Sequence, residues 1–142
     1  MPTQIPFRVV IDTNVVFEGV TKQGGACSLI VDAWSAELFR PSVSNALAYE
    51  YTEVLSRLLS AERWQKIQPV LGTLLDQTEF IAVYFTWRPS SPDPGDELVI
   101  DCAMNAGATV VTSNVRDFQM AKQTLGLRVI TPVEFAIQLA YL

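Results

Sequence analysis

Short runs of β-branched and other apolar residues alternate along this chain with longer stretches in which apolar residues recur at helical spacing. The clearest run, Val9-Val10-Ile11, has the length of a buried strand and stops at Asp12. Strands that alternate with helices predict a three-layer α/β/α fold with a central, mainly parallel sheet of about five strands. The expected strands cover residues 8–11, 38–39, 80–85, 109–112 and 128–130.

The helical stretches have recognisable starts and breaks. Ser42 or Ser44 is the expected N-cap of the second helix, and Pro69 should kink or split the third. Residues 87–95 contain three prolines and two serines and are expected to form a loop. No repeat or linker divides the chain, so we expect one domain over residues 1–142. The expected helices cover residues 26–36, 43–59, 62–75, 96–105 and 115–123, with a last one from Pro132.

Histidine is absent from the sequence, and this absence removes whole classes of chemistry. It excludes Ser–His and Cys–His nucleophilic mechanisms and any histidine general base, which leaves carboxylates, lysines, hydroxyls and bound metal. The formal net charge of −5 argues against a strongly basic nucleic-acid binder. It does not argue against a nuclease, because an acidic site neutralised by metal contributes several negative charges itself.

The location and redox state are predicted from other features. No apolar run approaches the roughly 18 residues of a membrane span, so we expect no membrane association. Residues 1–4 lack the basic start of a secretory signal, and we therefore expect a cytoplasmic protein. Cys27 and Cys102 are isolated among apolar residues and are expected to be reduced core side chains rather than zinc ligands.

Ligands of parallel α/β sheets bind beyond the carboxyl ends of the strands, and two acids are aimed there. Asp12 directly follows the first strand, although an aspartate at such a place can also simply cap the next turn. Asp96 lies within the apolar stripe that a helical projection draws through Val99, Ile100 and Ala103. It suits a first helical turn, but an inward-facing carboxylate needs a partner because an unpaired buried charge is costly.

The same projection gives the neighbouring acids ordinary roles. Asp101 falls on the opposite side of the helix and is expected to be solvated, and Glu97 also falls off the apolar stripe. Asp93 precedes Pro94-Gly95 and is expected to serve a turn.

Three further polar residues can join the acids at the sheet edge. Glu50 lies on the flank of the apolar stripe of helix 43–59, where it can be a solvated glutamate or lean over the sheet. Asn114 and Asp117 follow the strand 109–112 and open the next helix, so they can cap that helix, face the acids, or do both.

Taken in order, these segments resemble the PIN domain, and in particular the bacterial group that includes VapC-type toxins and their stand-alone relatives. The resemblance covers nearly the whole chain, and its strength lies in the order and intervals of four pieces rather than in any single one. The pieces are Asp12-Thr13-Asn14, Ser44 through Glu50-Tyr51, Asp96 leading into Ala103 and Gly107, and Thr112-Ser113-Asn114-Val115-Arg116-Asp117-Phe118.

The resemblance implies roles for particular residues. Asp12, Glu50 and Asp96 match the three leading acids and Asp117 the later aspartate, which makes these four the catalytic and metal-binding residues. The supporting positions are Asn14, Thr112 and Asn114. Asn114 stands where many members have another aspartate. An asparagine at this position resembles the toxin-like branch and removes one formal charge. Arg116, beside the acids, can meet a substrate phosphate.

The activity implied by the resemblance is hydrolysis of phosphodiester bonds in single-stranded RNA with Mg²⁺ or Mn²⁺. Elementary chemistry agrees with the metal, because carboxylates crowded at one edge raise one another's pKa unless a cation neutralises them. Oxygen ligands suit Mg²⁺ or Mn²⁺ rather than zinc or copper. One metal ion activates a water, and a second would steady the leaving oxygen.

Two other functions and two kinds of partner stay open. A receiver-like phosphoacceptor is disfavoured, because Asp12 has no acidic neighbour and Lys122 lies within a helix rather than after a late strand. The loss of an acid at Asn114 leaves room for a catalytically inactive PIN-fold module that binds RNA or protein. In the toxin reading, an antitoxin would inhibit the enzyme by placing a basic side chain among the acids. Trp64 or Trp87 could serve a homodimer interface or the core.

Overall fold

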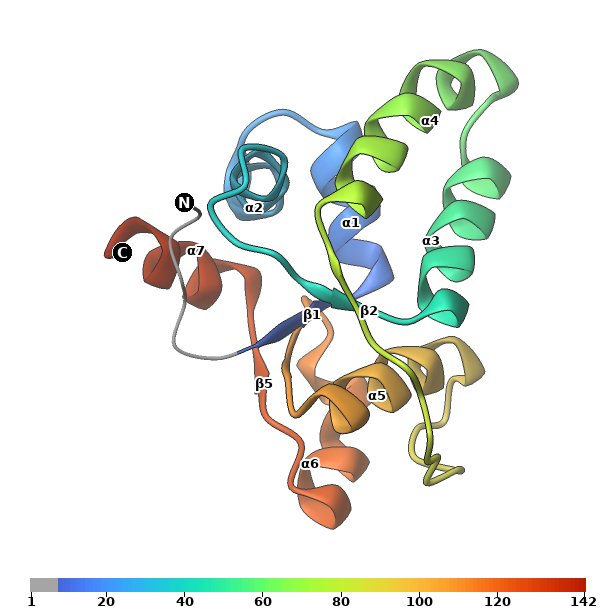
Figure 1. Ribbon diagram of the computed structural model, residues 1–142, viewed down its shortest axis with the longest axis vertical. Coiled ribbons are helices and arrows are strands. Elements are labelled where there is room, and N and C mark those ends of the chain that lie inside the picture. The colour runs from blue at the N-terminus through green and yellow to red at the C-terminus, as the bar shows by residue number, and fades with distance from the viewer. Residues whose placement is uncertain (1–7) are drawn as a thin grey trace.

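The computed structural model describes residues 8–142, so the N-terminal residues examined for a secretory signal lie outside the described part. Strand β1 (Val9–Ile11) pairs in parallel with β4 (Thr109–Val111), and β4 pairs in parallel with β5 (Val129–Ile130). A second, two-stranded parallel sheet joins β2 (Ser42–Val43) to β3 (Glu79–Phe80) and lies beside β1 (Figure 1). The parallel strands are as expected, but they form sheets of three and two strands rather than one of five.

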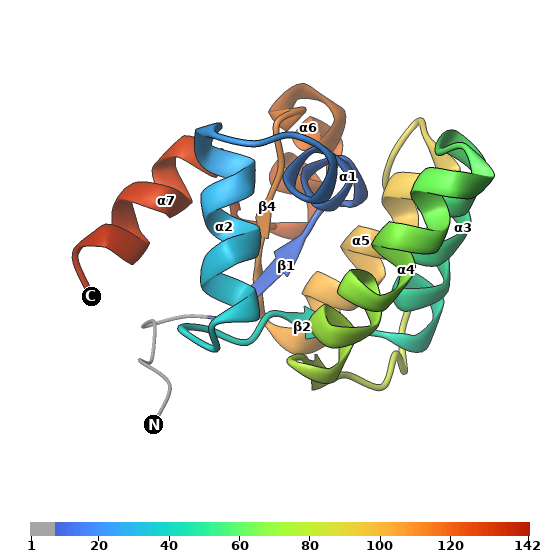
Figure 2. The ribbon, with the colours of Figure 1, turned by 90° about the horizontal axis from the view of Figure 1, so that it is seen from above.

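Helices cover both sides of the strands, which confirms the three-layer α/β/α architecture. Figure 2 shows α2 (Gly25–Ser35) and α7 (Pro132–Ala140) on one side of β1 and β4. The opposite side carries α3 (Asn45–Leu58), α4 (Ala61–Asp76) and α5 (Pro94–Ala106). The remaining helices are α1 (Thr13–Thr21), the 3₁₀ turn η1 (Val115–Phe118) and α6 (Gln119–Leu125).

The core lies between these layers and explains one error of the sequence prediction. Phe39, expected in a strand, is 2% exposed and packs edge-to-face on Phe135 with ring centroids 5.1 Å apart. It belongs to the core, and the strand begins later, at Ser42. Cys27 and Cys102 are buried and free, as expected. Over residues 8–142, no helix is both long and apolar enough to cross a membrane.

One further expectation about the middle of the chain was wrong, and another was wrong in part. The strand 80–85 is reduced to Glu79–Phe80, because its partner β2 has only two residues to pair with. Beyond it, the backbone N–H groups of Tyr84 and Phe85 donate to the Asn105 side chain at 3.0 and 3.2 Å. Of the expected kink or split at Pro69, the split was wrong, because α4 runs as one helix from Ala61 to Asp76.

The helix starts near the sheet edge are set by side-chain caps. The Ser44 hydroxyl accepts a hydrogen bond from the Leu47 N–H at 3.1 Å, so Ser44 rather than Ser42 caps α3. The Asp93 carboxylate accepts from the Gly95 N–H at 2.9 Å and caps α5, which confirms its expected turn role. These two caps direct the first turns of α3 and α5, the helices that carry Glu50 and Asp96.

Candidate active site

Asp12 lies at the carboxyl end of β1 and is held by the neighbouring strand. Its side chain is 3% exposed, and its Oδ2 accepts a hydrogen bond from Thr112 Oγ1 at 2.7 Å. The same hydroxyl accepts from the Asn114 N–H at 2.9 Å, so Thr112 links Asp12 to the turn after β4. Burial raises the pKa of Asp12, with smaller contributions from Asp117 and Asp93, while the Thr112 bond opposes the rise.

The support beneath Asp12 comes from α3. The Tyr51 hydroxyl is fully buried and donates a hydrogen bond to the Ile11 carbonyl, one residue before Asp12. Because Glu50 is the preceding residue of α3, this bond also fixes the turn from which Glu50 projects. Tyr51 is therefore a structural link between α3 and the end of β1.

Asp96 is the most perturbed acid of the site. Burial first, and then the charges of Asp12, Asp93 and Asp117, raise its pKa from 3.8 to about 7. Its Oδ2 is buried and has no hydrogen-bond partner among the described residues. A buried carboxylate oxygen without a donor is costly, so Asp96 needs either a proton or a cation.

Glu50 and Asp93 complete the acidic surroundings. Glu50 is half-buried, and burial raises its pKa, with Glu53 and Asp93 adding to the rise and Arg57 opposing it. Asp93, expected to serve only a turn, also contributes to the raised pKa values of Asp12 and Asp96. The signal in the sequence was the spacing of Asp93 and Asp96 across one helix start, which brings both carboxylates to the same end of α5.

The remaining expected residues lie on the turn after β4 or at the start of α1, and they are more exposed. Asn14, Asn114, Arg116 and Asp117 all have exposed side chains. Asn114 precedes η1 without capping it through its side chain, whereas its carbonyl accepts from the Asp117 N–H at 3.0 Å. Asp117 is close enough to Asp12 and Asp96 to raise the pKa of both.

Glu97 and Asp101 contradict the helical projection. Glu97 is 7% exposed and Asp101 is 4% exposed, although Asp101 was expected to be solvated and Glu97 to lie off the apolar stripe. The segment before α5 folds over that side of the helix, and Arg88 places its Nη2 2.6 Å from Asp101 Oδ2. A projection of one helix cannot show such a covering segment.

The donor set fits a divalent cation in its chemistry. The acids offer only oxygen, which suits Mg²⁺ or Mn²⁺, and Asp96 Oδ2 is a buried acceptor without a donor. Within residues 8–142, however, no three Asp, Glu, His or Cys side chains lie close enough together to hold one ion. The four acids expected to meet are therefore near neighbours rather than a closed cage. Mg²⁺ is commonly held by one or two carboxylates and keeps several waters, so the arrangement still fits it.

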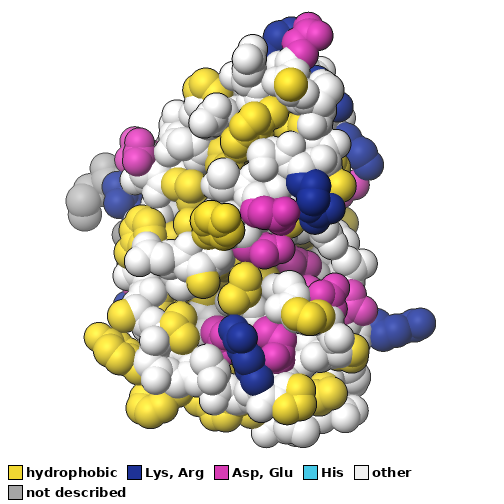
Figure 3. Space-filling view, turned by 90° about the vertical axis from the view of Figure 1, so that its right-hand side faces the viewer, with side chains coloured by type: hydrophobic (Ala, Val, Ile, Leu, Met, Phe, Trp, Pro, Cys, Tyr) yellow, Lys and Arg dark blue, Asp and Glu magenta, His cyan; other side chains and the backbone are white. Residues whose placement is uncertain are grey.

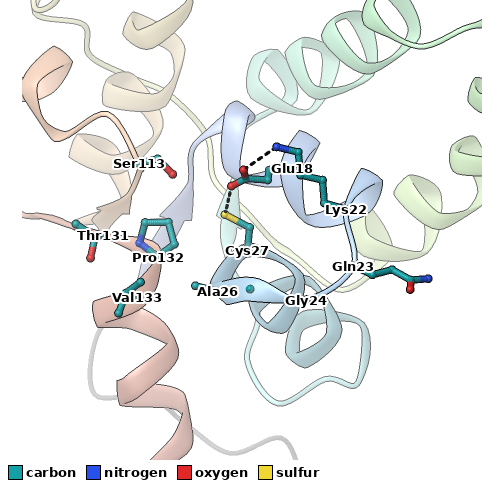
Figure 4. A pocket seen from close by; sticks show the side chains of 11 residues that line it. Glu18, Lys22, Gln23, Gly24, Ala26, Cys27, Ser113, Thr131, Pro132 and Val133 are labelled. Atoms are coloured by element: carbon teal, nitrogen blue, oxygen red, sulfur yellow. Dashed lines mark hydrogen bonds and ion pairs between the residues drawn. The ribbon is translucent and has the colours of Figure 1, made fainter.

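Acidic side chains gather on one visible face of the molecule. In Figure 3 they form a cluster over the middle of this face, with basic side chains lying against it and at its edge. A separate pocket of about 410 Å³ lies between α1, α2 and α7, and Ser113 at its rim is the neighbour of Thr112 (Figure 4). There Glu18 accepts from Cys27 Sγ at 3.0 Å, and burial and Glu18 raise the pKa of the Cys27 thiol to about 12. The thiol is thus protonated and unreactive.

A parallel sheet with carboxylates at the carboxyl ends of its strands places the chain among α/β proteins whose site lies at that edge. A family model described as PIN domain matches residues 8–116, and the chain belongs to the PIN domain family. PIN domains are in general nucleases, so nucleic acid is the class of substrate. The matched region contains Asp12, Glu50 and Asp96 and ends one residue before Asp117. No curated protein matches the chain.

Proposed function

We propose that this protein is a metal-dependent ribonuclease that hydrolyses phosphodiester bonds of single-stranded RNA. The observation that carries the proposal is Asp96, whose carboxylate has a pKa of about 7 and a buried oxygen without a partner beside Asp12. A cation beside this carboxylate would lower its pKa and would also give the buried oxygen a partner, so both features are those expected of a metal-binding carboxylate.

Asp12 and Asp96 would hold a Mg²⁺ or Mn²⁺ ion, with Asp117 and Glu50 contributing through water. When bound, such an ion lowers the pKa of water and stabilises the charge on a phosphoryl oxygen. Thr112 keeps Asp12 in one orientation through its 2.7 Å hydrogen bond. Glu50, half-buried and with a raised pKa, is suited to accept or release a proton at the edge of the site.

A single strand suits the acidic cluster better than a duplex. Two phosphate backbones would bring twice the negative charge to a face that carries several carboxylates (Figure 3). A flexible strand can present one phosphate to the metal and keep its neighbours in solvent. Arg116 is exposed beside Asp117 and can meet a flanking phosphate.

The experiment compares three end-labelled substrates of the same sequence: single-stranded RNA, duplex RNA and single-stranded DNA. We expect cleavage of the single-stranded RNA with Mg²⁺ or Mn²⁺, at least about tenfold slower cleavage of the duplex, and none with chelator. Equal cleavage in chelator would show a metal-independent contaminant or mechanism. Metal-dependent binding of RNA without any cleavage would favour an inactive PIN-fold module.

We also propose a toxin role, which rests on the resemblance to VapC-type proteins and on Asn114 at the position of a family aspartate. Expression of the chain alone in a bacterial host should then arrest growth, and the Asp12→Asn protein should not. An antitoxin would restore growth by placing a basic side chain among the acids. Normal growth with the wild-type protein expressed at the same level would contradict the toxin role and leave the nuclease proposal intact.

A further inference from the structure

A second group of buried charges lies behind the acids and has no part in the proposed chemistry. Glu97 and Asp101 are one turn apart on α5, and Arg88 reaches both. Its Nη2 is 2.6 Å from Asp101 Oδ2 and its Nε is 3.8 Å from Glu97 Oε2. Two buried carboxylates with a single guanidinium are costly unless further donors satisfy them. The hydrogen-bond donors that reach Glu97 therefore show which segment of the chain these buried carboxylates position.

Those donors come from the loop that leads into α5. Glu97 Oε1 accepts from the Ser90 hydroxyl at 2.6 Å, from the Ser91 N–H at 3.0 Å and from the Ser90 N–H. Ser90 and Ser91 are 2% and 6% exposed, so water does not compete for these bonds. The loop is thus folded around one buried carboxylate oxygen, and these three bonds lower the pKa of Glu97.

Ser91 connects the loop held by Glu97 to the acids of the candidate site. Its Oγ accepts from the Asp93 N–H at 3.2 Å and lies 3.4 Å from the Asp117 carbonyl, to which it donates. Asp93 in turn accepts a hydrogen bond from the Asp96 N–H through its carbonyl at 3.1 Å. The Ser91 hydroxyl therefore joins Asp93 to Asp117, and Asp96 follows through the Asp93 carbonyl. Glu97 fixes this serine by accepting a hydrogen bond from the Ser91 N–H.

We propose that Glu97 is a positioning residue for the metal-binding acids: by holding Ser90 and Ser91 it sets the placement of Asp93, Asp96 and Asp117 relative to one another. The inference rests on the proposed function only in taking these acids as the metal site. A glutamine at position 97 keeps the shape of the side chain. It offers at most one acceptor oxygen, however, and has no charge to balance Arg88.

The test is Mn²⁺ binding to the folded full-length protein, followed through the magnetic resonance signal of free Mn²⁺. Glu97→Gln should weaken Mn²⁺ binding by about tenfold or more, as changes to groups that orient metal ligands commonly do. Ser90→Ala removes only the hydroxyl donor and should weaken binding by a smaller factor. The matched control is Glu134→Gln, because Glu134 also accepts a loop N–H, that of Thr131 at 3.1 Å, at the start of α7.

The outcomes separate the positioning role from a purely structural one. In the nuclease assay, Glu97→Gln should need more Mn²⁺ but recover most of the wild-type rate at saturation, since no reacting group is lost. A Glu97→Gln protein that unfolds at a lower temperature yet binds Mn²⁺ as tightly as the wild type would overturn the inference.

Ser90→Ala decides the question if Glu97→Gln does not fold. Unchanged Mn²⁺ binding by the Ser90→Ala protein would also overturn the inference. A wild type that binds Mn²⁺ but cuts no RNA would contradict the proposed function alone, whereas one that binds no Mn²⁺ would overturn both.

Discussion

Replacing Asp96 by asparagine should make the metal-free protein more stable, by about 1–2 kcal/mol above pH 7 after allowance for solvent screening. The folded protein binds the Asp96 proton more tightly than the unfolded chain does, because the pKa rises from 3.8 to about 7. The wild type therefore loses stability as the pH rises through this window. Asparagine has no proton to lose, so the variant should escape this loss.

The measurement is the free energy of unfolding in denaturant at pH 4, 5.5 and 8, in chelator and in Mg²⁺. The two proteins should differ least at pH 4, where Asp96 is protonated in the folded wild type and pH 4 lies close to its pKa of 3.8 in the unfolded chain. Mg²⁺ should stabilise the wild type and have little effect on the variant, because the ion binds only the intact site. Asp32→Asn, which removes an exposed carboxylate from α2, serves as the control. An Asp96→Asn protein that is less stable than the wild type at pH 8 in chelator would contradict the cost assigned to the ionised Asp96 carboxylate.

Replacing Trp34 by alanine should destabilise the fold by about 3–5 kcal/mol, the usual range for a fully buried tryptophan. Trp34 is 0% exposed and packs near Phe39 with ring centroids 6.5 Å apart. Its Nε1 donates to the Gln77 carbonyl at 3.1 Å, which joins α2 to the residue after α4. The truncation leaves both a cavity and an unsatisfied carbonyl, so the two penalties add.

For a chain of this length, the loss corresponds to a fall in Tm of roughly 10–20 °C. The control is Trp87→Ala, because Trp87 is 38% exposed and lies in the irregular segment before α5. Its Tm should change by only a few degrees. A Trp34→Ala protein with a Tm within 3 °C of the wild type would show that the contact between α2 and α4 contributes little.

The sequence alone predicted the parts of the fold that depend on local pattern. Asp12 was placed correctly because a β-branched run ends there, and Asp96 because its own helix sets the direction of its side chain. The strand 80–85 was overpredicted, since aromatic and β-branched residues favour a strand only where a partner strand exists to pair with it. β2 provides that partner for only two residues.

The candidate site was less predictable, because its geometry depends on contacts between distant segments. Asp101 was expected to be solvated and Glu97 to lie off the apolar stripe, since a projection of α5 cannot include Arg88 or the loop at residues 89–93, which cover that side. The role of Asp93 was missed for the same reason. The separation of the acids, which leaves no group of three within reach of one ion among residues 8–142, also follows from tertiary packing.

The metal-dependent ribonuclease activity is best tested by cleavage of end-labelled single-stranded RNA by the wild type, Asp12→Asn and Asp96→Asn, purified side by side. We expect the wild type to cleave this RNA, and chelator to abolish the cleavage. Each variant should lose at least about a hundredfold in rate, as expected when one charged group of a catalytic site is removed. Equal rates for the three proteins would contradict this proposal, because the activity would then arise without the two carboxylates that define the site.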